Sequence, residues 1–166
     1  VQIHHQAVVN FLCSMRESLQ INADDTLFAV TTLSFDIAVL ELLLPLTVGA
    51  RVVISSSDGA ADGALLANAL TDTQATIMQA TPASWRSLLE AGWKGKHDLK
   101  ILCGGEALTN DLAMHLLERG AQLWNLYGPT ETTIWSTIYQ VTSNKNQGVS
   151  NTVPIGRPIA NTQIYI

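Results

Sequence analysis

Residues 127–131, which read YGPTE, bring together more chemical groups than a turn requires. Gly128 and Pro129 alone are enough to make a turn. The ring of Tyr127 adds a stacking surface, the hydroxyl of Thr130 adds a donor for phosphate, and the carboxylate of Glu131 adds a ligand for a metal ion. We therefore interpret this stretch as part of a binding site rather than as a plain connection.

Polar or glycine-rich turns also follow two earlier apolar segments, QATP at 79–82 and CGGEA at 103–107. Gly104 and Gly105 lack a Cβ and would let the backbone approach a flat ligand closely. Taken alone, the pair is better interpreted as an ordinary turn that needs positive φ. No G-x-G-x-x-G or G-x-x-x-x-G-K-[ST] pattern occurs in the 166 residues, so they contain no phosphate-cradling loop of either type.

Strand-like and helix-like segments alternate through most of the chain. Helical spacing of apolar residues predicts helices over 6–19, 37–48, 62–73, 82–92 and 110–120. Continuous apolar runs predict strands over 26–33, 50–55, 75–81, 99–104 and 121–127. Ser34 or Asp36 is a candidate cap for the second helix, and Thr109 for the last. The alternation predicts an α/β fold of the flavodoxin-like, doubly wound type, with a mainly parallel sheet and helices on both faces.

The chain changes character after the fifth strand. Segments 132–141 and 162–166 read as strands, and a polar loop at 142–151 joins them without a helix. We expect an antiparallel C-terminal extension of the sheet, or the start of another element. In open α/β sheets ligands bind beyond the carboxyl ends of the strands. The turns after 75–81, 99–104 and 121–127 would meet at that edge.

Composition narrows the class of protein. The 47% hydrophobic and 14% charged residues describe one well-buried globular domain. A net charge of −5 argues against nucleic acid, and Lys94, Lys96 and Lys100 fit a solvated loop. Cys13 and Cys103 make no disulfide framework, which favours a reduced, cytoplasmic protein. No apolar stretch is long enough to span a membrane.

Two common kinds of catalytic site are not indicated. The four histidines, His4, His5, His97 and His115, lack the spacing of metal ligands. No G-x-S-x-G elbow for Ser-His-Asp hydrolysis occurs in the sequence. The chemistry is therefore expected at the strand-end turns.

Four motifs in chain order resemble a known family. VQIHHQAVVNF at 1–11, SFDIAVLE at 34–41, NLYGPTETT at 125–133 and VPIGRPIANTQIYI at 153–166 are similar to segments of the adenylation domain of non-ribosomal peptide synthetases. That domain belongs to the AMP-forming, adenylate-forming enzymes. The resemblance covers residues 1–166 as a single substrate-selecting, internal core subdomain. It implies a ligase that joins an amino-acid carboxylate to ATP and releases pyrophosphate.

The resemblance also implies roles for the strand-end residues. Tyr127 would stack on adenine and face the backbone of 105–107, Thr130 would bind the α-phosphate, and Glu131 would ligate Mg²⁺. Thr130 and Glu131 are the catalytic candidates. The nucleotide-binding set implied by the family is Gly105, Glu106, Ala107, Asn125, Tyr127, Gly128 and Thr130.

For the amino acid, the resemblance assigns Asp36 to the α-ammonium group, a role to be weighed against a helix cap. The implied side-chain pocket comprises Ile37, Leu40, Gln79, Leu102, Gly104, Leu126, Ile134 and Trp135. This lining is bulky and, apart from Asp36, uncharged, so it cannot neutralise a charged side chain. The pattern is similar to the family's glycine-selecting one. Glycine is expected, with alanine or another small residue next, and the role of Gln79 stays open.

The resemblance further implies ATP and Mg²⁺ as cofactors, and partner domains. The aminoacyl group would pass to phosphopantetheine on a peptidyl carrier domain, beside a condensation domain. The family's phosphate loop and C-terminal lysine domain are not found in the 166 residues, so we expect this chain alone not to catalyse adenylation. Two alternatives are a non-catalytic α/β binding module and an enzyme adenylating aryl or acyl acids. Asp36 argues against the latter, because those acids have no amino group.

Overall fold

The sheet has seven strands in the order β2-β1-β3-β4-β5-β6-β7. The computed structural model describes residues 1–56, 59, 62–143 and 150–165. The strands are β1 (Thr26–Ala29), β2 (Arg51–Ile54), β3 (Ile77–Ala80), β4 (Lys100–Gly104), β5 (Gln122–Tyr127), β6 (Thr137–Val141) and β7 (Arg157–Pro158). β2, β1, β3, β4 and β5 are parallel to their neighbours. This is the flavodoxin-like order, so the predicted fold class is confirmed.

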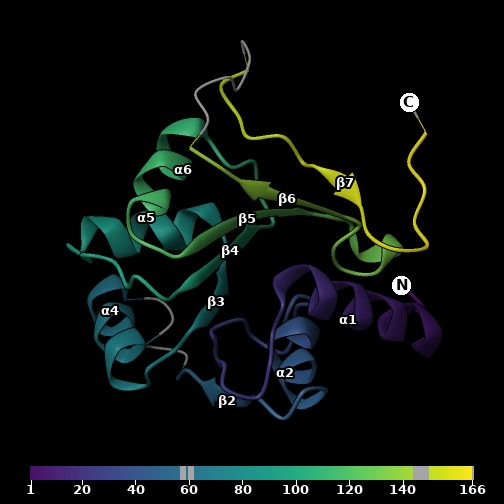
Figure 1. The fold of residues 1–166 in the computed structure, drawn as a ribbon, viewed down its shortest axis with the longest axis horizontal. Helices are drawn as coiled ribbons and strands as arrows, with labels where there is room; N and C mark the ends of the chain where they lie inside the picture. The colour runs from purple at the N-terminus through teal and green to yellow at the C-terminus, as the bar shows by residue number, and fades with distance from the viewer. Residues whose placement is uncertain (57–58, 60–61, 144–149, 166) are drawn as a thin grey trace.

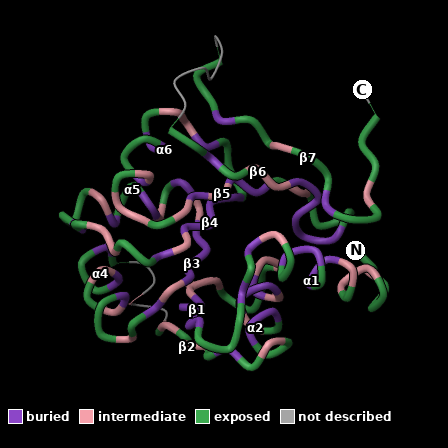
Figure 2. Tube along the Cα trace, viewed as in Figure 1, coloured by how far each residue is buried: buried purple, intermediate pink, exposed green. Residues whose placement is uncertain are grey.

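Helices cover both faces of the sheet (Figure 1). They are α1 (His5–Leu19), α2 (Ala38–Leu46), α4 (Gly63–Asp72), α5 (Pro82–Glu90) and α6 (Asn110–Leu117), with a 3-10 turn η1 (Thr130–Thr132). One buried apolar cluster joins the strands to α1 and α2, and a second joins them to α4, α5 and α6. Buried residues are concentrated along the central strands between these layers (Figure 2).

Alternate residues of a strand serve different clusters because successive side chains point to opposite faces. On β3, Met78 packs with α4, α5 and α6, whereas Ile77 packs with α1 and α2. On β4, Cys103 and Leu102 divide in the same way. Nearly continuous apolar strands are what a sheet covered on both faces requires.

Side-chain caps start three of the helices. Asp62 accepts hydrogen bonds from the backbone at the start of α4, and Thr81 and Thr109 do so for α5 and α6. The predicted cap of α2 is wrong. Ile37 occupies the cap position with helical backbone angles, and no side chain caps the helix. Neither Ser34 nor Asp36 therefore has a capping role.

The first strand ends at Ala29 rather than at residue 33. The next two backbone N–H groups, of Val30 and Thr31, donate to the Glu41 carboxylate at 3.0 and 2.9 Å. Because these donors are taken by a side chain, they are not available to a neighbouring strand. The chain leaves the sheet at this point and leads through residues 32–37 into α2.

The C-terminal extension is antiparallel, as predicted, but its bounds differ. β6 pairs with β5 and with β7 in antiparallel register. β6 begins at Thr137 rather than at 132, because η1 and a bend occupy residues 130–136. The strand predicted over 162–166 is wrong: residues 162–165 are not in a strand, and β7 lies at Arg157–Pro158 instead. Part of the predicted loop at 142–151 lies outside the described residues.

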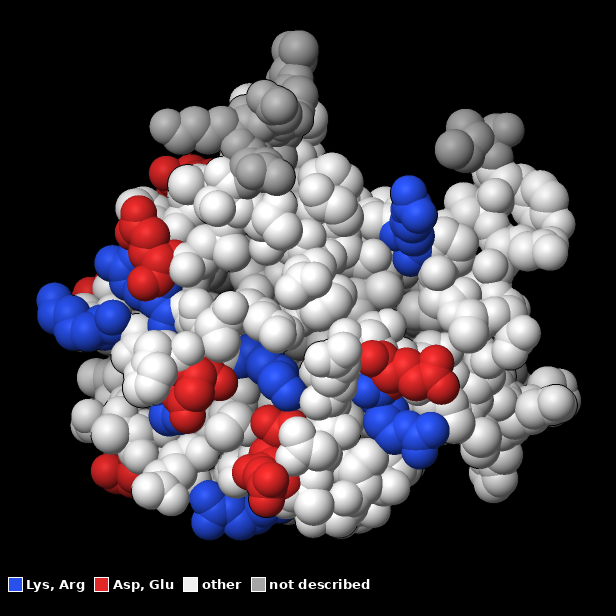
Figure 3. Space-filling view, viewed as in Figure 1, with Lys and Arg blue, Asp and Glu red and all other residues white. Residues whose placement is uncertain are grey.

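Charges are dispersed on the face shown in Figure 3, where Lys and Arg side chains are interspersed with Asp and Glu. No helix among the described residues is long and apolar enough to cross a membrane.

Candidate functional site at the carboxyl ends of the strands

A cavity of about 420 Å³ opens where β4 and β5 end. Every residue of the predicted nucleotide-binding set except Thr130 lines it. The lining residues are Gly105, Glu106, Ala107, Leu108, Asn125, Leu126, Tyr127, Gly128, Pro129, Trp135, Thr152, Val153 and Ile155. Parallel strands explain the gathering, because their carboxyl ends share one edge of the sheet.

Two of the lining residues differ in character. Gly105 has φ +88, a left-handed conformation that favours glycine. Tyr127 is 49% exposed and adds an open aromatic ring. An aromatic ring together with exposed backbone suits a flat heterocycle.

Sequence reasoning missed the part of the lining formed by Thr152, Val153 and Ile155. Asn125 is buried at the end of β5, and its amide nitrogen donates to the carbonyls of Val153 and Pro154 at 3.4 and 2.9 Å. Asn125 thus both lines the cavity and holds this segment in place. The VPIGRP stretch belonged to a recognised motif, but nothing in its residue types indicated a lining role.

The segment 128–136, between β5 and β6, folds back sharply on itself. A Cβ on Gly128 would lie 2.4 Å from the Ile134 carbonyl oxygen, so only glycine fits. Thr133 and Ile134 both have positive φ, of 73 and 69°. Such angles are strained for β-branched residues and, where they occur, tend to mark functional sites. The fold-back buries Ile134 and Trp135 beneath the turn.

Thr130 and Glu131 lie on the outside of that turn, in η1, and both are exposed. Among the described residues neither side chain has a hydrogen-bonding partner or an ion pair. No group of three or more His, Cys, Asp or Glu that could hold a metal occurs in the described part of the chain. One free carboxylate nevertheless fits Mg²⁺, which commonly uses one or two carboxylates together with substrate phosphates and water.

The predicted amino-acid pocket lies on the α1–α2 face. Leu40, Leu102, Leu126, Ile134 and Trp135 belong to one buried cluster, and Ile37 packs against it. Gly104 lies at the Trp135 indole: an added Cβ would be 2.7 Å from the Trp135 Cη2 atom and 2.8 Å from the Leu126 carbonyl oxygen. The structure therefore brings these predicted residues together and leaves little space between them.

Gln79 lies at the centre of this cluster with 1% of its surface exposed. Its amide nitrogen donates to the Ile37 carbonyl at 3.2 Å and to Glu41 Oε1 at 3.0 Å. Its amide oxygen accepts from Trp135 Nε1 at 2.8 Å. The orientation of the amide is fixed, because an indole N–H can only donate and a carbonyl can only accept.

Glu41 is fully buried and is a further residue of the site to which the sequence analysis gave no role. In addition to the Gln79 amide and two backbone N–H groups, it accepts from the Thr31 hydroxyl at 2.6 Å. Burial raises the pKa of the Glu41 carboxyl, and its hydrogen bonds oppose that rise. The sequence did offer one signal for this role, a glutamate within the apolar run 37–48.

Asp36 is half-buried, and its Oδ2 atom is buried without a hydrogen-bond partner. A buried carboxylate oxygen without a partner is uncommon in native proteins and calls for an explanation. It is adjacent in sequence to Ile37, the carbonyl of which is held by Gln79.

The buried thiol of Cys103 does not provide an alternative nucleophile. Burial, with a smaller contribution from the charge of Glu106, raises the pKa of Cys103 to about 12. The thiol stays protonated at neutral pH, and the thiolate is the nucleophilic form.

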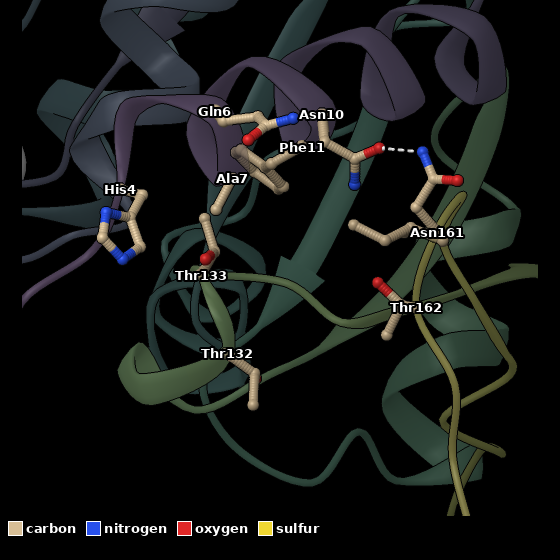
Figure 4. A pocket seen from close by; sticks show the side chains of 10 residues that line it. His4, Gln6, Ala7, Asn10, Phe11, Thr132, Thr133, Asn161 and Thr162 are labelled. Carbon is tan, nitrogen blue, oxygen red and sulfur yellow. Dashed lines mark hydrogen bonds between the residues drawn. The ribbon is translucent and has the colours of Figure 1, made fainter.

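A second cavity, of about 580 Å³, lies behind η1 (Figure 4). The start of α1, Thr132 and Thr133, and residues 159–162 line it. At one end the Asn161 amide donates to Asn10 Oδ1 at 2.7 Å, and the figure shows these side chains facing each other. Sequence reasoning did not indicate this cavity.

Comparison with known proteins identifies the family. The sequence model of a family described as "AMP-binding enzyme" matches residues 1–166. The chain belongs to this AMP-binding family. The dimodular nonribosomal peptide synthase of Bacillus subtilis (strain 168) is 40% identical over 166 residues, covering 100% of this chain and 7% of that protein. Tyrocidine synthase 3 of Brevibacillus parabrevis is 37% identical over 169 residues, covering 100% of this chain and 3% of that protein.

Among solved structures, one of holo-AB3403, described as a four-domain nonribosomal peptide synthetase bound to AMP and glycine, matches this AMP-binding chain with a TM-score of 0.88. The two sequences are 42% identical, and the match covers 96% of this chain and 12% of that protein. The resemblance to non-ribosomal peptide synthetases is thus confirmed over the whole sequence. This chain spans a small part of each relative.

Proposed function

We propose that this chain is the amino-acid-recognising and adenylate-binding core of a non-ribosomal peptide synthetase adenylation domain that activates glycine. The single observation that carries the proposal is the partnerless, buried Oδ2 atom of Asp36 beside an apolar cluster closed by Trp135. A buried carboxylate oxygen calls for a cationic or hydrogen-bonding partner. The α-ammonium group of an amino acid would supply one.

The size of the substrate follows from the crowding at Gly104. Trp135 and the Leu126 carbonyl lie so close that even a methyl group on Gly104 would collide with them. A substrate with a bulky side chain would need space that the indole fills. Excluding larger substrates by collision is the easier direction of discrimination, and glycine has no smaller competitor. The relative described as bound to AMP and glycine is consistent with this choice.

In the proposed reaction a glycine carboxylate oxygen attacks the α-phosphorus of ATP. The new P–O bond forms as the bond to the bridging oxygen of the β-phosphate breaks, giving glycyl-adenylate and pyrophosphate. Tyr127 stacks on adenine against the backbone of 105–107, and the Thr130 hydroxyl donates to an α-phosphate oxygen. Glu131 would hold Mg²⁺, which neutralises negative charge on the phosphates.

The remaining partners follow from the same proposal. The glycyl group would pass to the phosphopantetheine thiol of a peptidyl carrier domain, and a condensation domain would use the product. The cytoplasmic location expected from Cys13 and Cys103 stays a prediction.

Amino-acid-dependent exchange of pyrophosphate into ATP tests the proposal. It should be measured in an adenylation domain that carries this chain together with a phosphate loop and a C-terminal lysine domain. We expect glycine to give the highest kcat/KM and alanine the next. Preference for a large or charged amino acid would refute the choice of glycine, and activity only with aryl or fatty acids would refute the role of Asp36.

A further inference from the structure

Glu41 belongs to the SFDIAVLE motif, but the proposed function gives it no role. Glu41 is a residue of helix α2. Its carboxylate lies fully buried between this helix, the end of β1 and strand β3. All four hydrogen bonds that it accepts come from N–H or O–H donors. A carboxylate, which can only accept, matches this set of donors.

Two parts of the amino-acid site are joined through this carboxylate. On one side, Val30 and Thr31 donate to it, and they begin the 30–37 segment that carries Asp36. On the other side, Glu41 holds the Gln79 amide, which in turn binds the Trp135 indole. Gln79 also binds the carbonyl of Ile37 at the far end of that segment. The segment bearing the ammonium-binding candidate and the residue that closes the pocket are thereby fixed to each other.

We propose that Glu41 is a positioning residue that, through Gln79, fixes the Trp135 indole against Gly104 and so sets the upper size limit of the amino-acid substrate. The inference rests on the proposed function for its substrate and deepens it. Glu41 does not touch the amino acid. Together with the Ile37 carbonyl it holds the Gln79 amide nitrogen, and this keeps the amide oxygen directed at the indole N–H.

Replacing Glu41 by glutamine changes this orientation without changing the shape of the side chain. The oxygen of the new amide can accept from Val30 and Thr31, which leaves its nitrogen facing the Gln79 nitrogen. Two donors then oppose each other. If the Gln79 amide turns over to relieve this, its nitrogen meets the Trp135 N–H and its oxygen meets the Ile37 carbonyl. In the first case the Gln79 amide loses its anchor at position 41, and in the second the indole also loses its acceptor.

The main experiment measures kcat and KM for glycine and alanine in the adenylation domain described above. For Glu41→Gln we expect the ratio of kcat/KM for alanine to that for glycine to rise about tenfold, mainly through a lower KM for alanine, since one methyl group in a pocket is worth roughly that much. Adding Gln79→Glu should restore part of the selectivity. The carboxylate that this second change introduces can accept from both the amide at position 41 and the indole. One of its oxygens also faces the Ile37 carbonyl, so the restoration is partial.

Thr31→Val is the matched control. It removes one hydrogen bond to the same carboxylate but leaves the Gln79 contact in place, so the alanine-to-glycine ratio should not change. If Glu41 acted only by holding Val30 and Thr31, Gln79→Glu would not restore selectivity, because the Gln79 side chain makes no hydrogen bond to either residue in the described part of the chain. Absence of that rescue, or an unchanged ratio in a folded Glu41→Gln variant, would overturn the inference.

A second variant and a readout without substrate separate the positioning role from a failure of Glu41→Gln to fold and from the choice of amino acid. Gln79→Met keeps the length of the side chain and leaves Glu41 its other three donors, and it should raise the ratio in the same way. Hydrogen exchange of the Trp135 indole N–H, followed by NMR, should be faster in Glu41→Gln and Gln79→Met than in the parent. If the parent does not prefer glycine, the proposed function fails. Indole exchange that is unchanged in both variants refutes the positioning role by itself.

Discussion

The face of the sheet under α4, α5 and α6 is packed with apolar side chains, whereas the face under α1 and α2 buries Glu41 and Gln79 as well. On the first face the indole rings of Trp85 and Trp93 meet at a centroid distance of 6.0 Å, and Trp85 Nε1 donates to a backbone carbonyl, that of Leu102, at 3.2 Å. On the second, the Trp135 indole is held by a hydrogen bond to Gln79. One set of strands supplies both faces, because alternate residues point in opposite directions.

This difference indicates a division of labour. Apolar packing is non-directional and tolerates repacking, so the apolar cluster under α4, α5 and α6 stabilises the domain without a network of buried polar side chains. A fully satisfied buried polar network is directional, and it fixes side chains in unique positions. We therefore expect changes to the α4–α6 face to lower stability alone, and changes to the α1–α2 face to alter substrate selection as well.

The largest effect is expected from a matched pair of leucines, Leu88 in α5 and Leu40 in α2, both fully buried. Leu88→Ala and Leu40→Ala should each lower the free energy of unfolding by about 2–5 kcal/mol, measured by urea denaturation. Only Leu40→Ala should increase activation of alanine relative to glycine. Equal effects of the two changes on selectivity would contradict the division between the faces.

Asp36→Asn should lower kcat/KM for glycine on the order of a hundredfold or more, because a neutral amide cannot form an ion pair with the ammonium group. The free energy of unfolding should not fall, since Asp36 Oδ2 has no partner within the protein. Asp111→Asn, in an exposed residue of α6, is the control and should alter neither quantity appreciably. A stability loss as large as that of Leu88→Ala would mean that Asp36 is a structural residue.

Two glycines offer a comparison of intermediate size. A Cβ on Gly104 meets the Trp135 ring at 2.7 Å and the Leu126 backbone at 2.8 Å, whereas a Cβ on Gly120 meets the Ile101 side chain at 2.6 Å and a backbone oxygen, that of Leu99, only at 3.0 Å. Gly104→Ala should cost about 1–3 kcal/mol by overpacking and should lower glycine activation. Gly120→Ala should cost less and leave pyrophosphate exchange unchanged. If Gly120→Ala lowers pyrophosphate exchange more than Gly104→Ala does, the Trp135 indole does not limit the size of the pocket.

The smallest expected effect concerns pH. Burial raises the pKa of Glu41. At pH values between the ordinary pKa and the raised one, the native state therefore binds more protons than the unfolded state. The stability of the parent relative to Glu41→Gln should therefore fall as pH rises through that window. Urea unfolding of both proteins between about pH 4 and pH 7 measures the difference. A relative stability that rises with pH would show that the hydrogen bonds outweigh burial.

Much of the fold could be predicted because local rules decide it. The period of the apolar residues separated helices from strands, and Thr109 acts as a cap as expected. The errors occurred where distant groups compete with local preference. The residues after Ala29 continue a strand-like pattern, yet their backbone donors go to Glu41, which lies in the following helix. The segment 132–136 also reads as a strand, but the close approach of Gly128 to Ile134 bends it into a turn.

The sequence by itself determined the α/β class, the parallel edge where the turns meet, and the residue types offered there by Tyr127, Thr130 and Glu131. These depend on side-chain periodicity and on motifs of consecutive residues, which are visible in one dimension. Only the tertiary structure decided which buried polar groups pair. Gln79 is 38 residues from Glu41 and 56 from Trp135, and their hydrogen bonds depend on strand order, strand register and the fold-back after β5. The physical reason is that a hydrogen bond requires donor and acceptor at about 3 Å with correct direction, a condition that no local pattern encodes.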